Sequence, residues 1–105
     1  MTATRDARIT WYGHACTAIE AGGRTILVDP WFGNPKSPLA AAAVPACDLL
    51  LVTHGHGDHF GDAPALAERF RPAWPAIHEL SLYLHRTLSA AAAAGGVGMN
   101  KGGTV

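Results

Sequence analysis

Short apolar and β-prone stretches open the chain and predict strands. We expect these strands at residues 9–12, 16–20 and 25–28. Gly13 ends the first stretch, and Gly22 and Gly23 form a turn signal between the second and the third. Because the stretches follow one another so closely, they predict an antiparallel meander.

A continuous apolar run covers residues 48–53. Since a strand with one exposed face would alternate apolar and polar residues, this run predicts a strand buried on both faces. A loop rich in histidine follows it directly. Asp62 then stands where it can cap a helix over residues 63–70, with Pro64 tolerated in the first turn.

The last third of the chain predicts a strand, a helix and a further strand. Residues 73–77 are expected to form an irregular or edge strand, because Pro72 and Pro75 interrupt the hydrogen-bonding pattern. A helix is expected from Glu79 until Gly95 stops it, and residues 97–99 favour a strand. The apolar face of this helix is expected to consist of Leu80, Tyr83, Leu84 and Leu88.

Composition narrows the class of protein. With 105 residues, 49% of them apolar and 15% charged, the chain predicts one small globular domain. Eight basic residues balance eight acidic ones, so no nucleic-acid partner is expected. No apolar run approaches the roughly 20 residues that span a membrane, and the polar residues 1–8 lack a secretory signal. We expect a cytoplasmic protein in which Cys16 and Cys47 are buried free thiols, rather than a disulfide.

The chemistry concentrates in the loop after the apolar run. Its metal-binding residue types are His54, His56, Asp58 and His59. The glycines between them let the backbone turn tightly, so that the side chains converge. Paired imidazoles suit Zn²⁺ and similar metals, and two adjacent metals can lower the pKa of a shared water until it becomes a nucleophile. The alternatives are an accidental histidine-rich surface loop and a metal site that binds without catalysis.

This loop resembles the HxHxDH motif of the metallo-β-lactamase superfamily. Flanking segments are similar to a branch of uncharacterised metal-dependent hydrolases near the ascorbate-phosphate lactonases. These segments are residues 9–14, 26–31, 33–35 and 98–104. The resemblance implies an α/β fold, specifically the first half of a four-layer αβ/βα sandwich. It therefore implies that residues 1–105 are a single partial domain, truncated at its C-terminus, or half of a homo-oligomer.

The resemblance also implies a role for each site residue. His54 and His56 would bind a first metal, and Asp58, which we predict to be catalytic, would bind a second together with His59. Asp29 would position the ligand loop, the alternative being a simple turn residue. His14 would lie near the mouth of the site, the alternative being a solvent-facing histidine. The implied cofactor is one or two divalent metal ions, with zinc preferred and manganese or iron as alternatives.

The chain departs from the family where further ligands are expected. No aspartate follows Asp62, and the later histidines, His78 and His85, lie seven residues apart on a predicted helix, about 10 Å along its axis. We expect neither to bind the metal. Two hypotheses follow: a hydrolase that acts on a small-molecule ester, lactone or phosphoester through an activated water, or an inactive metal-binding or interaction module.

Overall fold

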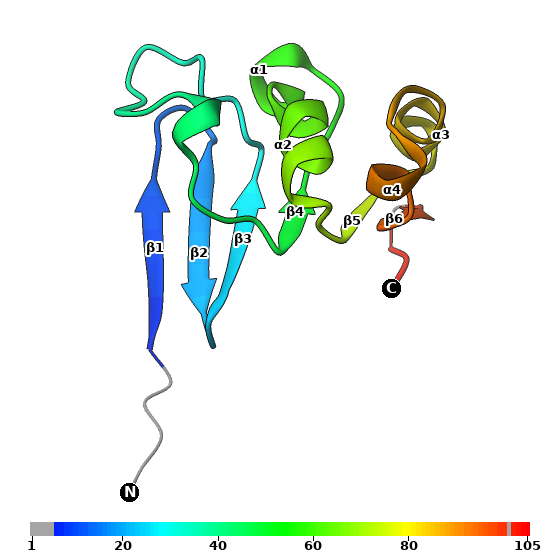
Figure 1. The fold of residues 1–105 in the computed structure, drawn as a ribbon, viewed down its shortest axis with the longest axis horizontal. Helices are drawn as coiled ribbons and strands as arrows, with labels where there is room; N and C mark the ends of the chain where they lie inside the picture. Colours follow the sequence, from blue (N-terminus) through cyan, green and yellow to red (C-terminus); the bar gives the residue numbers. More distant parts are fainter. Residues whose placement is uncertain (1–5, 101) are drawn as a thin grey trace, which may run out of the picture.

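The computed structural model describes residues 6–100 and 102–105, which form strands and helices in layers (Figure 1). The strands are β1 Ala7–Trp11, β2 Thr17–Ala21, β3 Arg24–Val28, β4 Leu49–Leu51, β5 Trp74–Ile77 and β6 Gly96–Met99. The helices are α1 Gly57–Phe60, α2 Ala63–Phe70, α3 His78–Thr87 and α4 Ala90–Ala93, with a short 3-10 turn, η1, at Ala41–Ala43. The mixture of sheets and helices confirms the predicted fold class.

The first three strands form the predicted antiparallel meander. The order of the four-stranded sheet is β1-β2-β3-β4, and β4 joins parallel to β3. Gly22 and Gly23 both have positive φ angles, 58° and 76°, which is why glycines occupy the tight turn between β2 and β3. As a result β1, β3 and β4 run in the same direction, and their carboxyl ends meet at one edge of the sheet (Figure 1).

The core lies on one face of this sheet. Ala18, Leu27 and Leu50 occupy paired positions on neighbouring strands, and all three are buried together with Leu66 of α2. The prediction that the run at residues 48–53 is buried on both faces was wrong. Leu49 and Leu51 point to the opposite side and are only half-buried, because the helices among the described residues pack on the other side.

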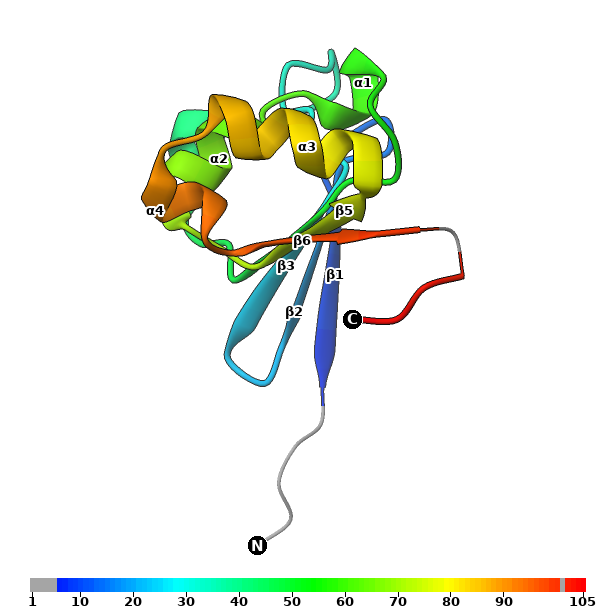
Figure 2. The same ribbon diagram turned by 90° about the vertical axis from the view of Figure 1, so that its right-hand side faces the viewer.

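A second, two-stranded sheet pairs β5 with β6 in parallel. It continues from the first sheet through a parallel bridge between Leu49 and Ala73. Helix α3 lies along β5 and β6 (Figure 2). The predicted strands at 73–77 and 97–99 are therefore confirmed, each shifted by one residue at its start.

The predicted helix from Glu79 to Gly95 is divided into α3 and α4. Helix α3 ends at Thr87, and the Ser89 hydroxyl accepts a hydrogen bond from the Ala92 N–H at 3.2 Å, which caps the start of α4. Leu84 is buried as expected. Tyr83 is not: it is 54% exposed, so its place on the predicted apolar face was wrong.

Helix α2 begins at Ala63 as predicted, but Asp62 does not cap it. The Asp62 carboxylate instead accepts a hydrogen bond from the Phe32 N–H at 2.9 Å, which fastens the loop after β3 to the start of α2. Cys16 and Cys47 are buried and free, as expected. Within the described part of the chain, no helix is both long and apolar enough to cross a membrane.

Candidate metal centre

The predicted site residues lie together at the carboxyl edge of the first sheet. His14 follows β1, Asp29 directly follows β3, and the loop from His54 to His59 follows β4. Because β1, β3 and β4 run in the same direction, their following loops emerge side by side (Figure 1). Segments far apart in sequence thereby contribute to one cluster, at the place where α/β proteins commonly bind ligands.

The histidine loop folds back on itself in a single helical turn, α1. His56 precedes this turn, while Asp58 and His59 lie within it. The ring centroids of His54 and His56 lie 4.7 Å apart, and those of His54 and His59 lie 4.1 Å apart. The predicted ligands of the first metal therefore lie next to a predicted ligand of the second.

Asp29 lies beneath this loop and is buried, with only 3% of its surface exposed. Its Oδ1 accepts a hydrogen bond from the Thr53 N–H at 2.7 Å, and its Oδ2 accepts one from the Thr53 hydroxyl at 2.8 Å. The same Oδ2 lies 2.8 Å from His59 Nδ1. An ionised carboxylate can only accept, so Nδ1 carries the proton and Nε2 of His59 is left with its lone pair for a metal.

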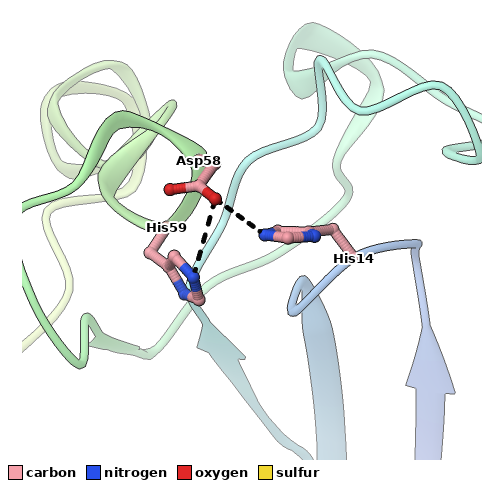
Figure 3. A group of neighbouring side chains, drawn as sticks. All are labelled: His14, Asp58 and His59. Atoms are coloured by element: carbon pink, nitrogen blue, oxygen red, sulfur yellow. Dashed lines mark hydrogen bonds and ion pairs between the residues drawn. The ribbon is translucent and has the colours of Figure 1, made fainter.

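His14 reaches the same cluster from the other side. Its Nε2 lies 3.0 Å from Asp58 Oδ2 (Figure 3). The His14 ring makes edge contacts with Trp31 and His59, with centroids 5.5 and 5.1 Å away. The structure thus brings His14 into contact with the motif residues, whereas the sequence left a solvent-facing position open.

Asn34 holds the turn that carries His14. The Asn34 side-chain amide donates hydrogen bonds to the carbonyl oxygens of Tyr12 at 3.0 Å and Trp31 at 2.8 Å. A Cβ atom on Gly13 would lie 2.0 Å from Asn34 Oδ1, and Gly13 has a φ of 96°, so a glycine is needed there. Sequence reasoning gave no role to Asn34, although the resemblance included it within residues 33–35.

Thr53 is the second residue whose part in the site sequence reasoning missed. Besides its bonds to Asp29, its hydroxyl lies 2.8 Å from His54 Nδ1. It therefore links the buried carboxylate to the first histidine of the loop. Its place directly before His54 in the motif was the available signal.

The electrostatics of the cluster favour an ionised carboxylate. Partial desolvation acts to raise the pKa of Asp58, but the hydrogen bond from His14 and the charge of His59 outweigh it. The pKa of Asp58 therefore lies below its usual value. An anionic oxygen beside imidazole nitrogens is a donor set that suits zinc and similar divalent ions.

The donor atoms are close enough to share an ion. Ligand atoms of His14, Asp58 and His59 all lie within 4.8 Å of one another (Figure 3). The residues present thus fit a divalent metal. His85, by contrast, packs its ring on Trp74 at 4.9 Å, and its Nδ1 lies 2.8 Å from the Ser81 carbonyl oxygen. This anchors His85 to α3, outside the cluster.

Fold and site together define a metal-binding α/β protein whose ligands lie at the carboxyl ends of its strands. The chain belongs to the metallo-beta-lactamase superfamily, whose family model matches residues 9–99. This membership implies a divalent metal and confirms the family resemblance of the sequence.

Relatives agree with this assignment. The chain is 46% identical over 98 residues to a UPF0173 metal-dependent hydrolase of Archaeoglobus fulgidus, covering 92% of this chain and 39% of that protein. It is 38% identical over 97 residues to another from Caldivirga maquilingensis, covering 92% and 41%. A solved structure, Igni18, a metallo hydrolase from Ignicoccus hospitalis, matches with a TM-score of 0.77 and 31% identity, covering 90% of this chain and 40% of Igni18. The chain thus spans about two-fifths of the length of these relatives.

Proposed function

We propose that the chain carries the metal-binding part of a hydrolase that cleaves a small-molecule ester, lactone or phosphoester with an activated water. The observation that carries the proposal is the series of contacts above the buried Asp29, in which His54 lies against His56 and His59, and His59 lies beside Asp58. Chains named metal-dependent hydrolases resemble this one across the whole of that region.

Each residue of the site would have a distinct role. His54 and His56 would bind one metal, Asp58 and His59 another, with zinc the preferred ion and manganese or iron the alternatives. The chemistry a bound divalent metal supplies is Lewis acidity, which lowers the pKa of water toward neutrality. Asp29 would hold His59 in the tautomer that leaves Nε2 available, and the ionised Asp58 would be the catalytic carboxylate next to the reacting centre.

A hollow beside the cluster offers room for part of the substrate. It has a volume of about 240 Å³, and Trp11, His14, Trp31 and Lys36 are among its lining residues. Two indole rings and one cation suit a small molecule with an apolar body and an anionic group. We also propose a cytoplasmic location, which the free buried thiols support.

A metal-binding module without catalysis is the second candidate. It is favoured by the packing of the His85 ring on Trp74, which keeps this histidine outside the cluster. In the hydrolase, further ligands would have to come from water or from additional protein.

The test is hydrolysis of a generic phosphodiester and a simple lactone with added Zn²⁺ or Mn²⁺. We expect turnover that is lost in His56→Ala and kept in His78→Ala, since His78 opens α3 outside the cluster. Absence of turnover with every metal, while metal still binds, would instead favour the binding module.

A further inference from the structure

We propose that His14 is a third protein ligand of the metal held by Asp58 and His59. This rests on the metal centre proposed above, and it assigns to His14 a role beyond lining the mouth of the site. His14 stands 44 residues before Asp58 in the chain, so its approach to the carboxylate is a product of the fold rather than of the motif.

The distances favour ligation by all three side chains. His14 Nε2 lies 3.0 Å and His59 Nε2 lies 3.9 Å from the same oxygen, Asp58 Oδ2. Zinc binds imidazole nitrogen and carboxylate oxygen at ~2.0–2.2 Å, so the ligand atoms around one ion lie about 3–4 Å apart. The three side chains need only small adjustments to surround one ion (Figure 3).

The backbone of His14 is held in a costly conformation. Its φ of 51° lies in the left-handed region, which costs a residue other than glycine about 1–3 kcal/mol. The Trp11 indole N–H donates to the His14 carbonyl oxygen at 2.7 Å, and the Asn34 bonds fix the turn that precedes it. Such strain persists only where the surroundings impose it, and here its effect is to aim the imidazole at Asp58.

The His14 ring packs against the cluster, although 42% of its side chain remains exposed. The His14 ring stands edge-on to Trp31, at 90° between the planes, and its centroid lies 5.1 Å from that of His59. The ring therefore lies between the hollow lined by Trp31 and the proposed ligands. If His14 binds the metal, a residue that lines the substrate hollow is also a ligand of the metal centre.

The test is zinc binding by the complete chain, measured by calorimetric titration and by the visible spectrum of the cobalt-loaded protein. His14→Ala removes the imidazole. His14→Gln keeps a hydrogen-bond donor but is a poor metal ligand. His78→Ala is the matched control on α3. We expect both His14 variants to weaken the site of Asp58 and His59 at least about 10-fold and to alter the cobalt bands, while His78→Ala matches the wild type.

Two results would overturn the proposal. If His14→Gln binds zinc like the wild type and only His14→Ala is impaired, His14 merely orients Asp58 through a hydrogen bond. If both variants keep wild-type affinity and cobalt spectrum, His14 is no ligand at all. A wild-type chain that binds no zinc is a different failure, because it removes the metal centre on which the inference rests.

Discussion

At Asp29 a single buried carboxylate joins the end of β3 to the histidine loop. It accepts hydrogen bonds from the backbone and hydroxyl of Thr53 and faces Nδ1 of His59. Its own φ of 46° is left-handed, which turns the chain sharply after the strand. The position of the ligand loop therefore depends on this residue, although it is not itself a predicted ligand.

Replacing Asp29 tests this dependence. Asp29→Ala leaves the Thr53 N–H and His59 without their acceptor, so we expect the free energy of unfolding to fall by about 1–3 kcal/mol. Metal affinity should fall about 10–100-fold, because the orientation of His59 is lost. Urea denaturation and zinc titration measure the two effects. Asp6→Ala removes an exposed carboxylate and serves as the control; an Asp29 variant equal to it would contradict this role.

The cysteines give a residue-scale prediction on pH. Burial, reinforced by the charges of Asp62 and Asp29, raises the pKa of Cys16 to about 12. Burial and the charge of Asp48, partly offset by a backbone hydrogen bond with Leu27, raise the pKa of Cys47 to about 11. Both thiols are therefore neutral at pH 8, and the nucleophilic thiolate forms only at much higher pH.

We expect the native chain to react negligibly with a disulfide reagent such as DTNB at pH 8. After unfolding in guanidinium, both free thiols should react at the rate of an ordinary exposed cysteine. The absorbance of released thionitrobenzoate measures this. Rapid labelling of the native chain would contradict the described burial of Cys16 and Cys47.

At the scale of elements, the sequence predicted those strands and helices whose formation depends on neighbouring residues. The meander follows from apolar runs separated by glycine, and the start of α2 was predicted from Asp62 and from Pro64, which a first turn tolerates. The sequence could not predict which hydrogen-bond partner a polar side chain takes when several are within reach. Asp62 bonds to Phe32 across the chain instead of capping α2, and Ser89 starts a new helix that local periodicity does not reveal. Both outcomes depend on tertiary contacts.

The same distinction applies to the candidate site. The motif predicted the four loop residues because these metal-binding residue types lie within six consecutive positions of the sequence. The contact of His14 with Asp58 depends on β1 and β4 running in the same direction, and on the turn that Asn34 holds. The spacing of residues within the motif therefore could not predict the contact between His14 and Asp58.

The packing of β6 against β5 also gives a prediction. A Cβ atom on Gly96 would lie 2.1 Å from Cζ2 of Trp74, whose indole is buried. We expect Gly96→Ala to lower the free energy of unfolding by about 1–3 kcal/mol through overpacking. Urea denaturation measures it against Gly57→Ala, whose Cβ would meet nothing within 4 Å. If the two variants are equally stable, the close approach of β6 to Trp74 is wrong.

At the scale of the whole molecule, one face of the sheet is apolar and open among the described residues. Ile9, Ile19, Ile26 and Leu49 form a cross-strand row on the side opposite the core. Ile9 is 70% exposed, and the adjacent Trp11 is 59% exposed. A groove of about 490 Å³, lined in part by Val28, Leu51, Ile77 and Met99, continues this surface. Contiguous apolar surfaces of this kind mark contact sites.

We expect the 105-residue chain on its own to cover this face with a second copy of itself. The cross-strand row carries no charged side chain, so two copies related by a twofold axis meet without repulsion. Sedimentation velocity should show a dimer that Ile9→Lys dissociates. Leu82→Lys, at an exposed apolar position on α3, should leave it intact. A wild-type monomer at all concentrations would contradict this expectation.

Metal content per chain tests the central claim most directly. Protein purified without a metal-affinity tag is analysed for zinc, manganese and iron, next to the double variant His54→Ala/His56→Ala. We predict near-stoichiometric metal in the wild type and a lower metal content in the double variant, because these two imidazoles, whose ring centroids lie 4.7 Å apart, are the proposed ligands of the first metal. Metal-free wild-type protein would contradict the assignment of this loop as a metal centre, and equal metal in both proteins would contradict metal binding by His54 and His56.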